Sequence, residues 1–324
     1  MEKIKFDLKD KRILDELDQD ANIPLSRLAK KVGISSQVAE YRVKRLISQG
    51  TIWGFFTLVD PSKRGYSLFR VHLQLKNVKE EVYASFARRL FKDYPTFWVA
   101  FVSGSFDIII DIWSLNIDTF NTLFREILEK NSDIIKSYEI IPILELSLFE
   151  YGYFLKEKNI RDKITLFRNF ENIKIDEKDK RILHTIKNNS RQSFEAIGNH
   201  VGLTRNAVKY RIKDLEKRKV IAEYKMMVRF QHFDRTTYKI LIRYDSSKID
   251  QEKSLLDCLK NRSGILSYTK LLSRWNLDIE IEPKDVKELQ VFLIALRNKF
   301  DIIDNYELVQ VIEDYGIDFF PNTL

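Results

Sequence analysis

Apolar residues near the start of the chain recur at the spacing of α-helices. Ile13 and Leu17 fall on one face of a helix that begins after Asp7, which is placed to accept hydrogen bonds from its first turn. A second helix is predicted over residues 24–32, and it ends at Gly33, a residue that turns the chain sharply at little cost. A third helix follows, so the pattern predicts a helix-turn-helix head.

The third helix has one apolar and one polar face. Ala39, Val43 and Leu46 lie four and three residues apart and point into the head. The opposite face carries Ser36, Gln37, Glu40, Tyr41, Lys44 and Arg45. In a helix-turn-helix protein this is the face that lies in the major groove of DNA.

Beyond the head the apolar period changes from that of a helix to that of a β-strand. Residues 51–58 are rich in β-forming side chains, and residues 68–76 alternate between apolar and polar positions. The elements predicted next are strand 68–76, helix 79–93, strands 96–103 and 106–114, helix 117–131 and strand 135–148. Their βαββαβ order is that of a ferredoxin-like sandwich.

The whole pattern occurs twice in the chain. Residues 10–14 recur as residues 179–183, an offset of 169, and the same offset relates Gly33 to Gly202 without a gap. The elements predicted in the second copy, after strand 220–228, are strand 238–245, helix 252–262, strands 265–273 and 275–282, helix 284–299 and strand 303–313. The predicted fold class is therefore α+β, with two winged helix-turn-helix heads, each followed by a ferredoxin-like sandwich.

This repeat divides the chain into five segments. The heads are residues 1–58 and 175–228, the sandwich domains are residues 65–155 and 236–324, and a charged linker covers residues 156–174. The linker contains neither Gly nor Pro. A helical spacer and a loose connection are both compatible with this composition.

Composition limits the possible functions. The 324 residues are 44% hydrophobic, which is enough for two buried cores. The 55 Lys and Arg against 47 Asp and Glu give a formal charge of +8, which is compatible with a polyanionic partner. A single cysteine, Cys258, excludes an intramolecular disulfide and a cysteine-rich zinc site. The N-terminus has no signal-peptide core and the apolar runs are too short to cross a bilayer, so we expect a cytoplasmic protein without membrane contact.

Basic residues concentrate on the third helix of each head. Residues 35–50 carry a charge of +2 and residues 204–219 a charge of +5. A solvated basic face is the alternative interpretation. Because the charges lie on the side that faces the groove, we expect double-stranded DNA as the partner. Base contacts are expected from Ser36, Gln37, Tyr41 and Lys44 and from Arg205, Asn206, Lys209 and Lys213. The other residues expected at the interface are Ser35, Arg42, Arg45, Thr204, Tyr210 and Arg211, with Lys217 and Arg218 as further candidates for phosphate contacts.

Arg42 and Arg211 have a second interpretation, because each flanks the apolar stripe of its helix. Arg42 can brace the first helix through Asp15 or Glu16 instead of contacting phosphate. The two outer faces also differ in sequence. If both heads bind, the DNA site is predicted to be asymmetric, and the chain acts either as its own pseudo-dimer or as a homo-oligomer.

The motif D-x-x-D-x-x-I-L at the start of each head, the V-G-[IL]-[ST] turn and the βαββαβ domain together resemble the Lrp/AsnC family of transcription regulators. The resemblance covers essentially the whole chain, once per half. It implies DNA binding by the heads, dimerisation through the sandwich domains, and sensing of a small molecule, often an amino acid.

In that family a G-x-x-D turn between the second and third strands serves the effector site. The resemblance places this turn at Gly104, Ser105, Phe106 and Asp107. In the second copy it points to Asp278, with Trp275 in place of the glycine. A bulky ring there would fill the space of a ligand, so we expect the second site to be altered or unused.

Other chemistry has weaker support in the sequence. Asp107 and Asp111 share a strand face, as do Asp278, Glu280 and Glu282. These carboxylates would suit a ligand amine or a cation, and solvated acids at a sheet edge are the alternative. The four histidines are scattered, and no phosphate-binding or nucleophile motif occurs, so we predict no catalytic residue, metal site or cofactor.

Two other functions remain compatible with the resemblance. Siroheme decarboxylases join a vestigial head to the same sensor fold and bind a tetrapyrrole. A partner that assembles with related regulators without binding DNA is the third possibility. The leading interpretation is a sequence-specific DNA-binding regulator and not an enzyme.

Overall fold

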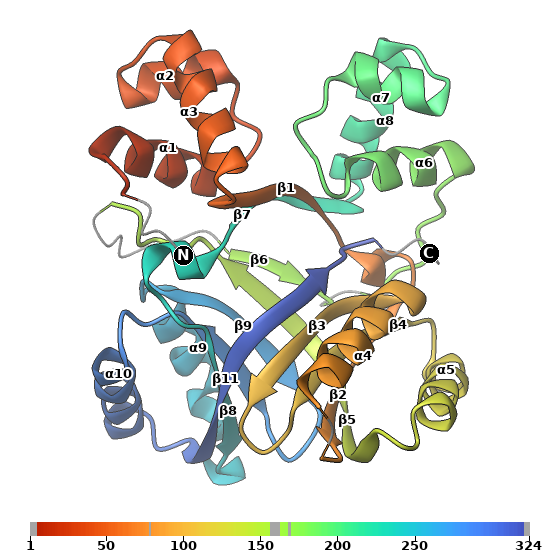
Figure 1. The fold of residues 1–324 in the computed structure, drawn as a ribbon, viewed down its shortest axis with the longest axis vertical. Helices are drawn as coiled ribbons and strands as arrows, with labels where there is room; N and C mark the ends of the chain where they lie inside the picture. Colours follow the sequence, from red (N-terminus) through yellow and green to blue (C-terminus); the bar gives the residue numbers. More distant parts are fainter. Residues whose placement is uncertain (1–4, 78, 156–162, 168–169, 321–324) are drawn as a thin grey trace.

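Two helical heads stand on one β-rich body, as Figure 1 shows. The computed structural model describes residues 5–77, 79–155, 163–167 and 170–320. The first head consists of α1 (Leu8–Gln19), α2 (Leu25–Val32) and α3 (Ser36–Ser48), and the second of α6 (Glu177–Ile186), α7 (Phe194–Val201) and α8 (Arg205–Lys217). All six helices follow the predicted pattern, and Ile13, Leu14 and Leu17 are fully buried as their spacing predicts.

A two-stranded ribbon joins the heads. β1 (Ile52–Val59) pairs antiparallel with β7 (Ile221–Val228), so the strand that leaves one head pairs with the strand that leaves the other. Each strand of the ribbon also contributes a residue to the hydrophobic core of the opposite head. Val228 packs into the core of the first head, and Val59 packs into the core of the second. The sequence predicts both strands, but it does not predict that they pair.

Each half continues into the predicted sandwich. The first consists of β2 (Ser67–Leu75), α4 (Glu80–Asp93), β3 (Thr96–Ser103), β4 (Ile108–Ser114), α5 (Ile117–Lys130) and β5 (Ile135–Phe149). The second consists of β8 (Tyr238–Tyr244), α9 (Glu252–Lys260), β9 (Ile265–Leu271), β10 (Leu277–Ile281), α10 (Val286–Lys299) and β11 (Ile303–Ile317). Short 3-10 helices precede β2 (Pro61–Lys63), β8 (Phe230–Phe233) and α9 (Ser246–Gln251).

The long last strand of each sandwich connects the two sheets into a closed ring. β5 pairs with β2 of its own half and with β9 of the other, and β11 pairs with β8 and with β3. The order around the ring is β2-β4-β3-β11-β8-β10-β9-β5. Helices cover the outer faces, and the two inner faces enclose a shared core that includes Trp113 and Trp275. The shorter strands β2, β4 and β10 are therefore buried over most of their length, whereas the long strands β5 and β11 have many exposed positions.

The linker contains a strand, which neither predicted alternative includes. β6 (Lys163–Leu166) pairs antiparallel with the end of β5, where Leu166 lies opposite Leu146. Residues 156–162 and 168–169 of the predicted linker lie outside the described residues. Among the helices of the described residues, none is long and apolar enough to cross a membrane.

Candidate nucleic-acid interface

The turn between the second and third helices of each head is built as the sequence predicts. Gly33 and Gly202 both have a φ of +71°, in the left-handed region that favours glycine. The Ser35 hydroxyl accepts a hydrogen bond of 3.3 Å from the Val38 amide, and the Thr204 hydroxyl accepts one of 3.3 Å from the Ala207 amide. These caps fix the start of α3 and α8, where free backbone amides face solvent.

Most of the residues predicted at the interface are on the surface. The exposed members are Ser35, Ser36, Gln37, Tyr41 and Lys44 in the first head and Thr204, Arg205, Asn206, Lys209, Tyr210 and Lys213 in the second. Tyr41 is 66% exposed and Tyr210 is 74% exposed, which is unusual for an aromatic side chain without a partner molecule. The Lys44 side chain is 72% exposed, although its Nζ lies 2.7 Å from Glu40. These side chains are available to a second molecule.

Arg42 and Arg45 are held by α1 instead of pointing outward. Arg42 Nη1 lies 2.8 Å from Asp7 Oδ2 and 2.8 Å from Asp10 Oδ1, and Arg45 Nη2 lies 2.5 Å from the same Asp10 oxygen. The Asp10 backbone amide and the Arg42 guanidinium together lower the pKa of Asp7 below its usual value. Arg42 thus has the bracing role, but through the capping box of α1 and not through Asp15 or Glu16.

The second head repeats this brace. Arg211 Nη1 lies 2.8 Å from Asp176 and 2.7 Å from Asp179. The counterpart of Arg45 is Asp214, which pairs instead with Arg218 at 2.9 Å. The two heads therefore share one internal design and differ in the charges that α3 and α8 present.

The loops of the two heads also contact each other. Arg191 Nη1 donates a hydrogen bond of 2.6 Å to the carbonyl of Ala21, and Nη2 donates one of 2.9 Å to the carbonyl of Ile23. Next to it, the Ser190 hydroxyl donates to the side-chain oxygen of Asn22 at 2.8 Å. No motif in the sequence indicates this contact, which fixes the first head against the second.

The predicted effector turn is a tightly packed connection between β3 and β4. Asp107 Oδ2 accepts a hydrogen bond of 2.7 Å from the Leu75 amide, while Gly104 and Ser105 are exposed. Gly104 has a φ of +155°, and a Cβ there would lie 3.4 Å from the carbonyl of Leu308 in the other half. Phe106 is buried and stacks on His72, with ring centroids 3.9 Å apart.

Asp278 does not belong to the second copy of this turn. Asn276 makes the bond that Asp107 makes in the first copy, since its side-chain oxygen accepts a hydrogen bond of 2.8 Å from the Tyr244 amide. The alignment that put Asp278 opposite Asp107 was therefore wrong by two residues. The 169-residue offset holds through the turn, and the counterpart of Asp278 is Ile109.

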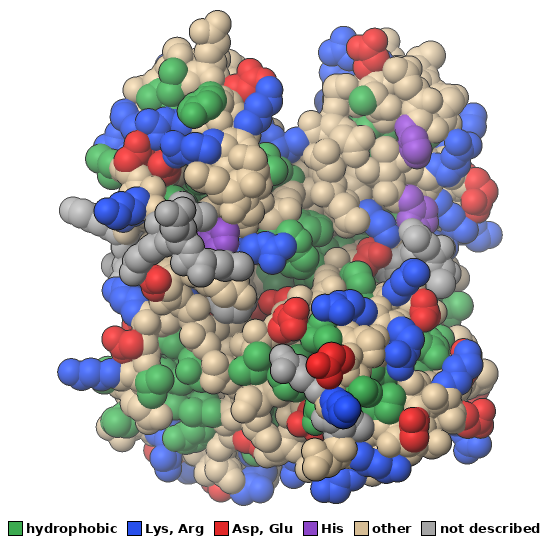
Figure 2. Space-filling view, viewed as in Figure 1, with side chains coloured by type: hydrophobic (Ala, Val, Ile, Leu, Met, Phe, Trp, Pro, Cys, Tyr) green, Lys and Arg blue, Asp and Glu red, His purple; other side chains and the backbone are tan. Residues whose placement is uncertain are grey.

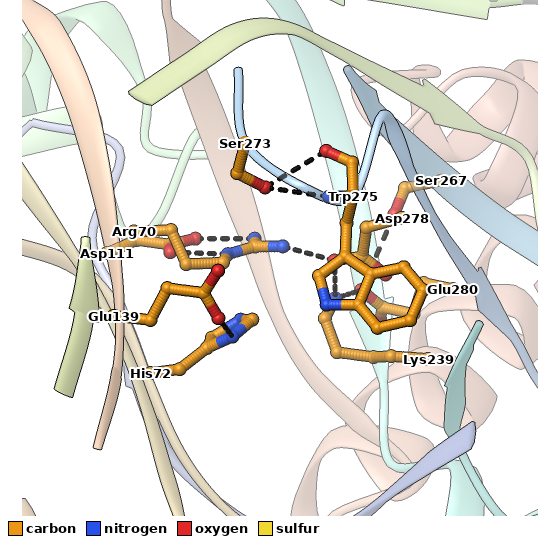
Figure 3. Close-up of polar contacts among 10 residues, drawn as sticks. All are labelled: Arg70, His72, Asp111, Glu139, Lys239, Ser267, Ser273, Trp275, Asp278 and Glu280. Atoms are coloured by element: carbon orange, nitrogen blue, oxygen red, sulfur yellow. Dashed lines mark hydrogen bonds and ion pairs between the residues drawn. The ribbon is translucent and has the colours of Figure 1, made fainter. Parts of the chain in front are cut away.

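Asp278 instead joins two ion pairs at the centre of the ring (Figure 3). Arg70 pairs with Asp111 across β2 and β4, through two contacts of 2.8 Å. At the equivalent place in the other half, Lys239 lies 3.2 Å from Glu280. Asp278 contacts both cations, since its Oδ2 pairs with Arg70 and lies 3.1 Å from Lys239.

Asp111 and Asp278 are buried, contrary to the alternative of solvated sheet-edge carboxylates, whereas the Glu280 side chain is 27% exposed. The side chains of Asp111 and Asp278 are at most 1% exposed. His72 is also buried, and burial together with the Arg70 charge holds its pKa well below its ordinary value, so its imidazole is neutral. In the sequence, two signals pointed to members of this cluster: the polar positions of residues 68–76 and the shared strand faces of Asp111, Asp278 and Glu280.

Comparisons with known proteins agree with this description of the heads. A model of winged helix-turn-helix DNA-binding domains matches residues 6–52, and a model of the AsnC-type helix-turn-helix domain matches residues 175–216. The HTH-type transcriptional regulator AldR of Mycolicibacterium smegmatis is 32% identical over 126 residues, which are 39% of this chain and 74% of that protein. The regulator FL11 of Pyrococcus furiosus is 30% identical over 113 residues, which are 35% of this chain and 73% of that protein.

One solved structure is similar over nearly the whole length. The siroheme decarboxylase NirDL superposes with a TM-score of 0.66 at 15% sequence identity, covering 97% of this chain and 94% of that one. At this identity the likeness shows a shared fold: two heads and two sandwiches arranged in the same way.

Proposed function

This chain belongs to the Lrp/AsnC family of DNA-binding transcription regulators, as a tandem of two units, and we propose that α3 and α8 contact two half-sites of one duplex. The observation that carries the proposal is the exposure of corresponding faces on both helices. Lys44 and Lys213 occupy the same position in the repeat, and both are exposed. Arg42 and Arg211 form ion pairs with aspartates of their own heads. We therefore assign the base and phosphate contacts to their exposed neighbours.

The two half-sites are expected to differ. Arg205 and Asn206 stand where the first head has Ser36 and Gln37, and these side chains prefer different base edges. A tandem chain also joins two unlike heads through one two-stranded ribbon. This supports a pseudo-dimer that recognises an asymmetric site, whereas a symmetric dimer of identical subunits recognises a near-palindrome.

Selection of bound sequences from random double-stranded DNA tests this function. We expect an asymmetric consensus, and an affinity that falls steeply with salt because several phosphates are neutralised. Recovery of a perfect palindrome would contradict the pseudo-dimer. Absence of DNA affinity even at low salt would favour the assembly partner that does not bind DNA.

We further propose that a small molecule, an amino acid in the first instance, acts at the Gly104–Asp107 turn. Two features support this site: Gly104 and Ser105 are exposed, and the turn packs against β11 of the other half. Repeating the DNA selection with free amino acids present tests the response. The expected result is a change in affinity with one amino acid that is lost in Ser105→Trp, while Ser132→Trp, on an exposed turn elsewhere, retains it.

A tetrapyrrole enzyme is the second candidate, and the full-length likeness to a siroheme decarboxylase favours it. The likeness concerns the fold, whereas the sequence relatives are regulators. An absorbance scan of the purified protein separates the two candidates. A Soret band retained through purification supports the enzyme, and a spectrum of aromatic residues alone supports the regulator.

A further inference from the structure

A cavity of about 400 Å³ lies between the β1–β7 ribbon and the open end of the strand ring. This volume is within the range of small-molecule sites in proteins. Its floor is formed by Arg70, Asp111, Lys239 and Glu280 of the ion-pair cluster and its wall by Trp98 and Asp314 on β3 and β11. Trp53 of the ribbon and Arg229, directly after β7, lie above. Figure 2 shows the recess beneath the two heads, with acidic side chains along its lower side. The Gly104–Asp107 turn is not among the lining residues, so this is a separate place in the molecule.

The cations at the floor of the cavity are already engaged. Arg70 pairs with Asp111 and Asp278, and Lys239 lies 3.1 Å from Asp278 and 3.2 Å from Glu280. These five groups together carry two positive and three negative charges when all are ionised. The cations of the floor are thus neutralised within the cluster, and the lining as a whole carries acids and bases in similar numbers, since Lys225 and Arg229 also belong to it.

The acids of the wall receive their hydrogen bonds from neutral donors. The Trp98 indole donates to Asp314 at 2.8 Å, and the Tyr315 hydroxyl donates to Glu313 at 3.0 Å. Asp314 is exposed and lines the cavity. Burial and the Glu280 charge raise the pKa of Asp314 to about 6. Lys239 and Arg229 act against this shift, and both are engaged elsewhere, Lys239 with Asp278 and Glu280 and Arg229 at the Trp53 ring.

Aromatic faces next to these acids already accept cations. The Lys239 ammonium lies 4.9 Å from the centre of the Trp98 ring, and the Arg229 guanidinium lies 5.9 Å from the centre of the Trp53 ring. A ring face beside a carboxylate is the arrangement that recognises an organic cation, since the ring attracts the charge and also packs against the apolar part of the ligand. A carboxylate placed at this wall would instead meet the like charges of Asp314 and Glu313.

We propose that this cavity binds a compact organic cation, a primary amine with an apolar body, whose ammonium group pairs with Asp314 beside the Trp98 ring. The inference goes beyond DNA binding and does not depend on it. Binding is therefore measured on the full chain without DNA, which keeps a failure here distinct from a failure of the regulator function.

Phenethylamine is the probe, with 2-phenylethanol and 3-phenylpropionate as neutral and anionic analogues of nearly the same shape. Calorimetry and tryptophan fluorescence report binding, because Trp53 and Trp98 line the cavity. We expect the amine to bind at least about 10-fold more tightly than the alcohol, and the acid not to bind at the same concentrations. Equal binding of the three compounds, or no binding of the amine at millimolar concentration, would overturn the proposal without any variant.

The variant Asp314→Asn keeps the shape of the side chain and can still accept a hydrogen bond from Trp98. It is expected to weaken phenethylamine binding at least about 10-fold, which corresponds to about 1.4 kcal/mol, and to leave the binding of 2-phenylethanol unchanged. Asp301→Asn, on an exposed turn before β11, is the matched control and is expected to bind like the wild type. Wild-type affinity in Asp314→Asn would show that the amine binds elsewhere.

Discussion

Arg42 and Lys44 lie two residues apart on α3, but the Arg42 side chain contacts α1 whereas the Lys44 side chain is exposed. Arg42 points back to the capping box of α1, where Asp7 and Asp10 accept its hydrogen bonds, while the Lys44 side chain is 72% exposed. The sequence alone does not distinguish the two, since both are basic residues of the recognition helix. The direction of each side chain decides whether its charge stabilises the head or is available to DNA.

Arg42→Ala is expected to destabilise the first head by about 1 kcal/mol, because the pair is partly exposed and Arg45 still contacts Asp10. Hydrogen exchange of the α1 amides measures this locally. Lys44→Ala is the matched control, and its exchange should equal that of the wild type. Equal protection of α1 in Arg42→Ala and the wild type would contradict the bracing role.

Glu282 gives the protein a distinct dependence of stability on pH. Burial raises the pKa of Glu282 to about 8, against an ordinary value of 4.5, and Tyr153 donates a hydrogen bond to it at 2.7 Å. The folded protein therefore keeps this proton in a range where the unfolded chain releases it. Its contribution to stability is present below about pH 4.5 and is lost as the pH rises to about 8.

Glu282→Gln removes this ionisation while keeping the size of the side chain. We expect the free energy of unfolding of the variant to exceed that of the wild type by an amount that grows from pH 5 to pH 8. Denaturant unfolding at several pH values measures the difference, and Glu129→Gln, on an exposed face of α5, is the control. A difference that shrinks toward pH 8 would contradict the assignment.

The residues of the buried ion-pair cluster show which features of the site could not be predicted from the sequence. The alternation in residues 68–76 correctly separated Arg70 and His72 from the apolar face, but it could not show that the polar face is buried as well. That burial depends on the second half of the chain, which supplies Asp278 and Lys239 to the cluster. Asp278 itself was misaligned because an acid near a turn was matched by residue type, whereas the backbone bond to Tyr244 identifies Asn276.

At the scale of the element, local sequence signals were sufficient to predict the helices of the heads and the order of elements in each sandwich, but not the pairing of β1 with β7. Caps such as Asp7 and Ser35, the glycines of the turns and the helical spacing of apolar residues all act within a few positions, so all six head helices and both βαββαβ units could be predicted. The pairing of β1 with β7 could not, because residues such as Phe55 and Met226 meet across more than half of the chain. β6 was missed for another reason: its partner β5 is near in the sequence, but a strand of four residues is too short to show a period of its own.

Lys44 of α3 and Lys213 of α8 provide a matched test of the two recognition helices. Replacing either one with Ala is expected to weaken DNA binding and to reduce the slope of log affinity against log salt by about 0.9 if the lysine contacts a phosphate. Lys287→Ala, on an exposed position of α10, should leave the slope unchanged. An unchanged slope in Lys213→Ala alone would mean that Lys213, unlike Lys44, does not contact a phosphate.

At the scale of the whole molecule, the positions of the heads are fixed by contacts between the two halves. The β1–β7 ribbon joins the two heads, and the Arg191 guanidinium of the second head donates hydrogen bonds to the carbonyls of Ala21 and Ile23 in the first. The Arg191 guanidinium also lies 5.1 Å from the centre of the Phe55 ring of the ribbon. If both heads bind DNA as proposed, we expect this arrangement to present α3 and α8 at one separation, so that the distance between half-sites is part of what the protein recognises.

Arg191→Ala removes the contact between the loops without changing α3 or α8. We expect affinity for the selected site to fall modestly, while tolerance for one or two base pairs inserted between the half-sites increases, because the heads can then adopt other separations. Binding to a series of duplexes with altered spacing measures this, and Arg243→Ala, which breaks a surface pair with Asp304 on the body, is the control. If Arg191→Ala discriminates spacing as sharply as the wild type, the ribbon alone sets the separation of the heads. In that case substitutions in the β1–β7 pairing, and not in the loops, would be the ones that relax it.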